Sequence, residues 1–116
     1  MGYKNKTSVL VQLREANADR CPTFGHEVKD WSLPQWGNAV AGEVGELCNV
    51  IKKIDRGDFS LKEANKQFLI ADEAADIVIY LDLLCQRAGV SLQTALVQKF
   101  NETSEKIGSD ITIFHY

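Results

Sequence analysis

The sequence predicts an all-α protein built around four helices. Two long stretches, residues 33–55 and 60–87, carry apolar residues at the three- and four-residue spacing of a helix that packs on a core. Serines suited to cap the start of a helix precede three of the four predicted helices, at Ser32, Ser60 and Ser91. We therefore expect a core that resembles a four-helix bundle.

The first helix is expected at about residues 7–19. Its apolar residues suit one helical face, with polar residues elsewhere, and they are Val9, Leu10, Leu13 and Ala16. The helix should end at Cys21, because a residue that precedes a proline avoids the helical region of backbone conformation. Residues 23–31 show no clear period and are interpreted as a connection.

The second helix has a defined start and end. Ser32 is its predicted N-cap, Pro34 lies in its first turn, and Gln35 stands at the capping-box position. The helix should run to about Asp55, because the Arg-Gly-Asp sequence at residues 56–58 interrupts the pattern.

An apolar seam with heptad-like spacing runs along this second helix and contains an acid. The seam is formed by Leu33, Trp36, Val40, Glu43, Leu47, Val50 and Ile54. A solvent-facing side would not normally hold an acid in such a series. Glu43 is therefore expected to point inward.

The third helix opens with a second predicted capping box at residues 60–63. Its apolar seam is unbroken, which predicts the most buried helix, and consists of Ile70, Ala74, Ile77, Leu81, Leu84 and Ala88. The acids Asp72, Glu73 and Asp76 fall within one sector of about 100° around the helix axis. Tyr80 extends this sector by one turn.

The last helix is predicted from Ser91, its N-cap, through residues 92–106 to a stop at Gly108. Its inner face consists of Leu92, Ala95, Leu96 and Phe100. The tail, residues 110–116, is apolar for a chain end. We expect it to form a short strand or an arm that packs on a partner subunit.

The bulk composition is that of a soluble, single-domain protein. Of the 116 residues, 45% are hydrophobic and 25% are charged. The formal net charge of -3 argues against a nucleic-acid polymer as partner, since such binding depends on basic groups. The three cysteines form no Cys-x-x-Cys motif, which favours free thiols in a reducing compartment. Without a signal peptide or an apolar run of membrane-spanning length, a cytoplasmic location is expected.

Two pairs of acids, Glu43 with Glu46 and Glu73 with Asp76, carry the functional hypothesis. The members of each pair are three residues apart and are therefore neighbours on one helical face. Carboxylates from two packed helices could converge, and buried carboxylates stay ionised only beside a cation. Oxygen ligands without cysteine or histidine favour Mg²⁺, with Mn²⁺ as a possible substitute, over Zn²⁺. A di-iron site is disfavoured because neither motif contains a histidine.

The alternative is that these acids are ordinary surface residues that solubilise the chain. For any one acid this interpretation would be preferred, but Glu43 stands in an apolar seam and the motif recurs on two apolar helices. Under the alternative, the protein is a non-enzymatic helical interaction module whose apolar seams bind a partner. The residue pattern leaves both hypotheses open.

The two acidic motifs and their flanks resemble one known family. Trp31 and Trp36 precede residues 42–47, which read Gly-Glu-Val-Gly-Glu-Leu, and residues 72–81 read Asp-Glu-Ala-Ala-Asp-Ile-Val-Ile-Tyr-Leu. This arrangement resembles the MazG-like all-α nucleoside triphosphate pyrophosphohydrolases, whose pattern is Glu-x-x-Glu, a spacer and Glu-x-x-Asp. The resemblance covers about residues 31–108 and implies a single domain with the MazG-type all-α fold.

The predicted last helix adds to the resemblance. Residues 99–108 are similar to the basic, Asn-bearing last helix of the family, and Tyr80 matches a tyrosine of the related dCTP pyrophosphatases. Two positions depart from the pattern. Gly42 stands where many members carry a second glutamate, and Asn101 follows Lys99 more closely than in some dCTP-cleaving members.

The resemblance implies hydrolysis of a (deoxy)nucleoside triphosphate to the monophosphate and pyrophosphate, which would clean or balance the nucleotide pool. One or more Mg²⁺ ions would neutralise the phosphates, held by Glu43, Glu46, Glu73 and Asp76. Any of these four carboxylates could orient the attacking water. The resemblance also implies a homodimer or a dimer of dimers, and it leaves the preferred base and sugar open.

Five further residues are candidates for contacts with the nucleotide. Lys53 and Lys99 could contact phosphate oxygens, or could equally be solvated lysines near helix ends. Asn101, two residues after Lys99, is a candidate for the same role. Trp36 could stack on the base, although a tryptophan in a seam is more often a core residue. Tyr80 could cap the pocket or hydrogen-bond to a facing acid.

Overall fold

The computed structural model describes residues 8–57 and 63–114, and this part of the chain is all helical with no strand. Its elements in chain order are α1 (Val9–Arg20), η1 (Cys21–Phe24), η2 (Val28–Asp30), α2 (Leu33–Asp55), α3 (Glu63–Arg87) and α4 (Leu92–Ile107). The predicted all-α class and its four helices are confirmed. None of these described helices is long and apolar enough to cross a membrane.

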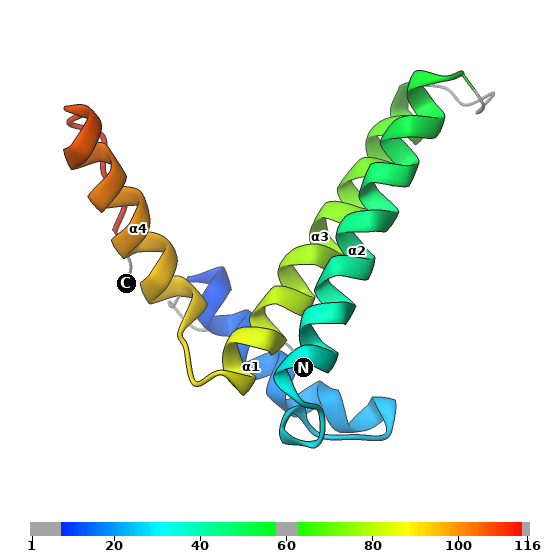
Figure 1. Cartoon of the computed structure of the whole chain (residues 1–116), viewed down its shortest axis with the longest axis horizontal. Helices are drawn as coiled ribbons and strands as arrows, with labels where there is room; N and C mark the ends of the chain where they lie inside the picture. The colour runs from blue at the N-terminus through cyan, green and yellow to red at the C-terminus, as the bar shows by residue number, and fades with distance from the viewer. Residues whose placement is uncertain (1–7, 58–62, 115–116) are drawn as a thin grey trace.

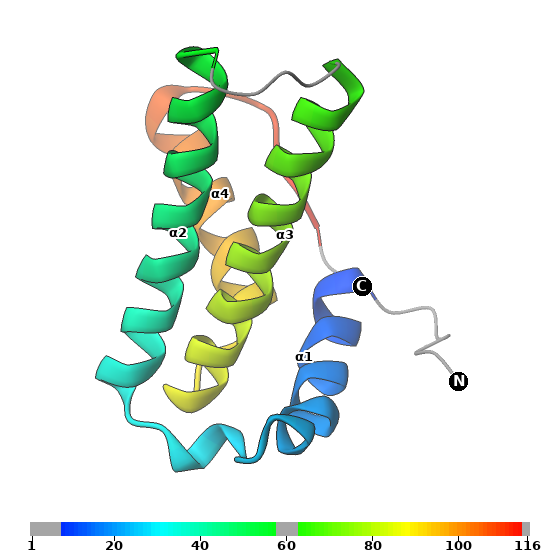
Figure 2. The ribbon, with the colours of Figure 1, turned by 90° about the vertical axis from the view of Figure 1, so that its right-hand side faces the viewer.

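Helices α2 and α3 form a long antiparallel hairpin that carries the acidic motifs (Figures 1 and 2). Helix α1 packs beside the C-terminal half of α3 (Figure 2). Helix α4 instead diverges from the hairpin, so that the chain has the shape of a V (Figure 1). The four helices of one chain therefore do not close around a common core.

Serine side chains cap three helices where they begin, and the caps at Ser32 and Ser91 were predicted. Ser8 accepts a hydrogen bond from the Val11 amide at 3.4 Å, and Ser91 accepts one from the Thr94 amide at 3.2 Å. The capping box of α2 is reciprocal, because the Gln35 amide donates to Ser32 Oγ at 3.3 Å and the Ser32 amide donates to Gln35 Oε1 at 2.8 Å. The predicted cap at Ser60 lies outside the described residues.

The core lies at the base of the hairpin, where α1, the connection and α3 meet. Its buried apolar side chains are Cys21, Trp36 and Leu83, with Val28, Trp31, Ala39, Tyr80 and Leu84 packed against them. Trp36 is 2% exposed, and its Nε1 donates to the Val28 carbonyl at 2.9 Å. The connection that showed no period in the sequence thus supplies one wall of the core.

A buried polar network ties α1 to α3. Asn17 Nδ2 donates to Asp82 Oδ2 at 2.9 Å, and Gln86 Nε2 donates to the same oxygen at 2.8 Å. Gln86 Nε2 also donates to the Arg14 carbonyl at 2.9 Å. Buried polar groups that are fully paired in this way hold two helices in one register.

The tail folds back on α4 of the same chain. The amide of Asn101 pairs with the backbone of Ile113 in both directions, donating to its carbonyl and accepting from its N–H, each at 2.9 Å. Within the described part of the tail, residues 109–114, there is no strand. The expected arm on a partner subunit is not tested by a single chain.

Many large apolar side chains stay exposed in the described part of the chain. On α4 and the tail, the exposed large residues are Leu96, Phe100, Ile107, Ile111 and Phe114, and on α2 and α3 they include Val44, Ile51, Phe68 and Val78. A groove of about 420 Å³ runs between α4 and the tail, bordered by Phe100, Ile107 and Ile111 among others. Exposed apolar side chains that lie together in this way are typical of surfaces that bind a partner or a ligand.

Candidate metal and nucleotide site

The hairpin brings acids of both motifs together. Glu43 lies on α2, and Glu73 and Asp76 lie on α3. One carboxylate oxygen from each of the three residues lies within 4.8 Å of the other two. Since residues three apart share a helical face, the antiparallel pairing of α2 and α3 turns the two motifs toward each other.

Two oxygens of this acidic cluster are buried without a partner. Glu43 Oε2 and Glu73 Oε2 are shielded from solvent and have no hydrogen bond. An unpaired buried carboxylate oxygen is costly, and such groups in folded proteins are usually paired or bound to a metal. These two oxygens are therefore the strongest observation in favour of a cation at the cluster.

Two carboxyl groups of the acidic cluster, Glu43 and Glu73, have raised pKa values. Burial raises the pKa of Glu43, and the neighbouring charges of Glu46, Asp76 and Glu73 raise it further. Burial is also the largest cause that raises the pKa of Glu73, followed by the neighbouring carboxylate of Glu46. A divalent cation would offset the charge repulsion that adds to the effect of burial at both residues.

Glu46 lies at the rim of the cluster. Its side chain is exposed, and it does not belong to the group of three converging oxygens. It nevertheless lies close enough to raise the pKa of both Glu43 and Glu73. Three of the four predicted ligands thus converge, and Glu46 lies beside them.

A pocket of about 380 Å³ adjoins the acidic cluster through Asp76 and Tyr80. Its other lining residues come from α1, the connection and the two hairpin helices, and they are Asn17, Arg20, Cys21, Phe24, His26, Trp31, Trp36, Ile79 and Leu83. The volume and the mixture of aromatic walls with a few polar groups are those of a small-molecule site. We call this the aromatic pocket.

Three rings line one side of the aromatic pocket. His26 stacks on Trp31 with ring centroids 4.4 Å apart and planes inclined by 12°. Trp31 in turn lies 4.5 Å from Trp36, centroid to centroid. The rings of Trp31 and His26 are only half-buried, so a planar ligand can reach this wall.

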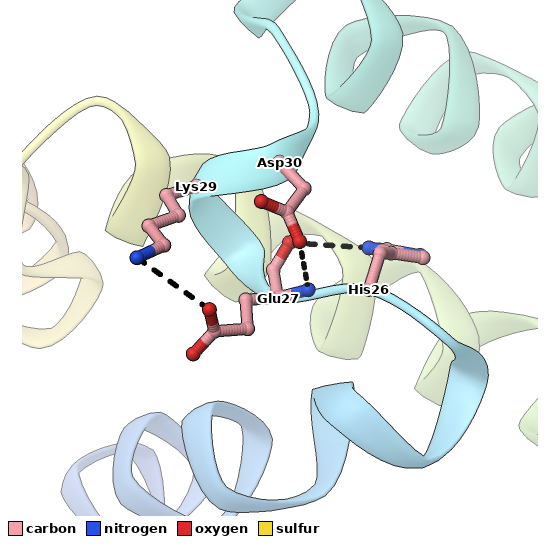
Figure 3. A network of polar contacts seen from close by, with 4 residues as sticks. All are labelled: His26, Glu27, Lys29 and Asp30. Atoms are coloured by element: carbon pink, nitrogen blue, oxygen red, sulfur yellow. Dashed lines mark hydrogen bonds and ion pairs between the residues drawn. The ribbon is translucent and has the colours of Figure 1, made fainter.

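The short loop that carries His26 is braced by its own polar contacts (Figure 3). The Glu27 amide donates to Asp30 Oδ2 at 2.7 Å, and Lys29 pairs with the Glu27 carboxylate at 3.5 Å. His26 Nδ1 lies 3.1 Å from the Glu27 carbonyl oxygen and 4.0 Å from Cys21 Sγ, and these contacts hold the ring in place.

Tyr80 stands between the aromatic pocket and the acidic cluster. Burial raises the pKa of its hydroxyl, as do the nearby charges of Glu43, Asp76 and Glu46, while Arg20 acts in the opposite direction. The hydroxyl is therefore a protonated donor near neutral pH. Arg20 itself lines the pocket, with its guanidinium carbon 5.9 Å from the centre of the Phe24 ring.

The predicted nucleotide contacts are only partly brought together. Trp36 and Tyr80 both line the aromatic pocket, although Trp36 is also a core residue. Lys53 lies on α2 seven residues beyond Glu46, or about 10 Å along the helix axis. Lys99 and Asn101 lie on the diverging α4, where Lys99 pairs with Glu102 at 3.7 Å and Asn101 holds the tail.

Sequence reasoning did not select several pocket residues. Trp31 and His26 lie in the connection without a clear period, so no pattern selects them for contact with a nucleotide. Asn17 and Arg20 received no role. A weak indication did exist for Asn17, because it continues the apolar series of Leu10 and Leu13 at helical spacing.

Comparison with known proteins adds nothing to this geometry. No model of a known protein family matches the chain, and no curated protein is found as a relative. The functional argument therefore depends on the residues of the site itself.

Proposed function

We propose that this protein is a Mg²⁺-dependent nucleoside triphosphate pyrophosphohydrolase of the MazG-like type. It would convert a (deoxy)nucleoside triphosphate to the monophosphate and pyrophosphate, as part of the housekeeping of the nucleotide pool in the cytoplasm. The observation that carries the proposal is the pair of buried, unpartnered oxygens of Glu43 and Glu73, beside a pocket with aromatic walls.

The donor set fits a hard divalent cation. Glu43, Glu73 and Asp76 offer converging oxygens, with Glu46 at the rim, and no nitrogen or sulfur donor belongs to the described cluster. Mg²⁺, or Mn²⁺ as a substitute, is the ion that prefers such ligands. When bound, the cation would neutralise phosphate oxygens and stabilise the charge that develops during hydrolysis.

The aromatic pocket would take the base and sugar. Trp31 and His26 offer ring faces for stacking, and Trp36 closes the floor. Tyr80, protonated and adjacent to Asp76, would donate a hydrogen bond to the sugar or to the α-phosphate. The base would thereby be held at one end and the triphosphate directed toward the acids.

Hydrolysis requires a water molecule in line with the leaving pyrophosphate. The water oxygen forms a bond to the α-phosphorus, the bond from this phosphorus to the bridging oxygen breaks, and pyrophosphate leaves with that oxygen. A carboxylate of Glu43, Glu46, Glu73 or Asp76 would orient the water and accept its proton.

The remaining negative charge of the triphosphate calls for cationic side chains. Arg20 lines the aromatic pocket, and Lys53 lies further along α2. Lys99 and Asn101, on the diverging α4, would reach a triphosphate only in an oligomer. We therefore include a homodimer or a dimer of dimers in the proposal, supported by the apolar surface that α4 and the tail leave exposed.

The same exposed surface favours a second candidate function. In a non-enzymatic interaction module, the apolar faces of α4 and the hairpin would bind another protein, and the acids would only keep the chain soluble. This alternative leaves the two buried, unpartnered oxygens without an explanation. The enzyme is therefore the preferred proposal.

Pyrophosphate release from a panel of deoxynucleoside and ribonucleoside triphosphates with Mg²⁺ tests the enzyme directly. Glu43→Gln and Asp76→Asn, which keep side-chain size, are expected to lower kcat by about 100-fold or more. Asp72→Asn is the matched control, since Asp72 is an exposed acid of the same helix outside the three converging oxygens. It is expected to stay within about twofold of the wild type.

The enzyme proposal fails if no triphosphate releases pyrophosphate and Mg²⁺ with a non-hydrolysable triphosphate analogue produces no thermal shift. Equal activity in the Glu43→Gln and Asp72→Asn proteins would also overturn it. The thermal shift on adding Mg²⁺ alone to the folded protein measures metal binding independently of turnover.

A further inference from the structure

Asn17 is a buried wall residue of the aromatic pocket. It lies on α1, is 3% exposed, and lines the pocket together with Asp76 and Tyr80. Burying an amide costs free energy unless its polar atoms form hydrogen bonds. The partners of this amide therefore indicate what remains for a ligand.

The orientation of the Asn17 amide is determined by its neighbours. Nδ2 donates to the Ile79 carbonyl at 3.0 Å and to Asp82 Oδ2 at 2.9 Å. Both partners can only accept, so an inverted amide would set oxygen against oxygen at two contacts. Asp82, itself 1% exposed, is held in turn by Gln86.

Both N–H groups of the Asn17 side chain are committed by these two contacts. The amide can therefore present only its carbonyl oxygen, Oδ1, to a ligand in the pocket. This oxygen is a rigid acceptor, because α1 and α3 fix the side chain on both sides. An acceptor repels phosphate oxygens, which places the triphosphate at the acidic end and leaves the base or sugar near Asn17.

We propose that Asn17 Oδ1 reads the edge of the base by accepting a hydrogen bond from an exocyclic amino group. This inference depends on the proposed function, because it assumes a nucleotide in the aromatic pocket. A base with a keto oxygen at the same position would set two acceptors against each other where water is largely excluded. Such mismatches are rejected more strongly than a simple loss of contact.

Matched nucleotide pairs isolate this effect. dCTP and dUTP differ in an amino and a keto group at one ring position, as do dATP and dITP. For the wild-type chain with Mg²⁺, we expect kcat/KM to favour the amino member of at least one pair by about tenfold or more. Asn17→Ala should bring that ratio close to one.

The ratio of kcat/KM for the amino and keto nucleotides distinguishes base recognition from a structural role. A loss of packing lowers kcat/KM for both nucleotides of a pair alike. Gln86→Leu is the matched control, because it damages the same network while leaving Asn17 Oδ1 in place. Its ratio should equal that of the wild type. If Asn17→Ala fails to fold, Asn17→Leu with Asp82→Asn removes the acceptor without leaving an unpaired buried charge, and its ratio should also lie close to one.

A second measurement distinguishes this inference from the proposed function. Binding of dCMP against dUMP, and of dAMP against dIMP, is followed without metal by the fluorescence of Trp31 and Trp36. Hydrolysis with a ratio near one, or in favour of the keto member, in both pairs overturns the role of Asn17 and leaves the enzyme intact. An Asn17-dependent preference for dCMP or dAMP without any hydrolysis supports the role and overturns the enzyme. Absence of both results overturns both.

Discussion

Glu43 Oε2 on α2 and Glu73 Oε2 on α3 are both buried, and neither has a hydrogen-bond partner in the described part of the chain. Two acids facing each other across a helical hairpin destabilise it unless a proton or a cation intervenes. Under the proposed function, this cost in stability of the metal-free protein is the consequence of a preformed set of oxygen ligands. Such a cost is typical of functional sites.

The first prediction concerns the pH dependence of stability without metal. Burial and neighbouring acids raise the pKa of Glu43 and Glu73 above the ordinary value of 4.5, so the folded protein binds more protons than the unfolded chain above that value. Their contribution to stability is fully present below pH 4.5 and is lost as the pH rises through the folded pKa values. In EDTA, the Tm should fall over this window.

Glu43→Gln should flatten this pH dependence, because it removes one titrating group and reduces the repulsion on Glu73. Mg²⁺ should offset the loss in the wild type at the upper end of the window, since its ligands bind as carboxylates. Thermal denaturation of both proteins over a pH series, with EDTA or with Mg²⁺, measures the effect. Identical slopes for the two proteins would contradict the assignment of the shift to the acidic cluster.

The second prediction separates two tryptophans of the aromatic pocket. Trp36 is 2% exposed and hydrogen-bonds to Val28, so Trp36→Ala should cost about 3–5 kcal/mol of unfolding free energy. Trp31 is half-exposed and stacks on His26, so Trp31→Ala should cost far less. Its main effect should be on nucleotide binding, weaker by about tenfold, because base stacking is worth about 1–3 kcal/mol.

Urea denaturation and KM for the best substrate distinguish these roles. Trp31→Phe keeps a ring at the wall and should retain most of the affinity. A loss of stability in Trp31→Ala comparable to that of Trp36→Ala would show that both residues serve the core alone.

The third prediction concerns Gly42, in the interior of α2. A Cβ atom added there would meet nothing within 4 Å, and Gly42→Ala should raise the unfolding free energy by about 0.5–1 kcal/mol. Gly25 is the opposite case, because its φ of 95° lies in the left-handed region and Gly25→Ala should be destabilising. Urea denaturation measures both. A stability loss in Gly42→Ala would indicate that another chain packs closely against this position.

The helices were predictable because each depends on local chemistry. Ser32 with Gln35, and Ser91, cap helices through hydrogen bonds within four residues, and the apolar seams repeat at the helical period. The V shape was not predictable in this way. A seam indicates which face is apolar, but the partner that covers it depends on the turn after α3, where Gly89 adopts a left-handed φ of 74°.

The candidate site likewise contains residues that the sequence pattern predicts and residues that it does not. Glu43 was expected inward because it stands in a seam, and it lies there with a buried oxygen beside Glu73 and Asp76. His26 and Trp31 come from a segment without periodicity, so only its three-dimensional path brings them to Trp36. Spacing rules describe regular elements and give no information on such a path.

The last prediction concerns association through the surface of α4 and the tail. Phe100 and Ile107 are 41% and 73% exposed and border the groove beside the tail. Neighbouring exposed apolar side chains of this kind mark an interaction surface. If a second copy covers this surface, Phe100→Asp should lower the molar mass in solution from a multiple of the chain mass to that of one chain. Light scattering coupled to size exclusion measures this directly.

Gln98→Glu, at an exposed position of the same helix that does not line the groove, should leave the mass unchanged. A wild-type protein that stays at the mass of one chain at all concentrations would refute association through this surface. It would then favour the single-chain site, with Arg20 as the pocket-lining cation.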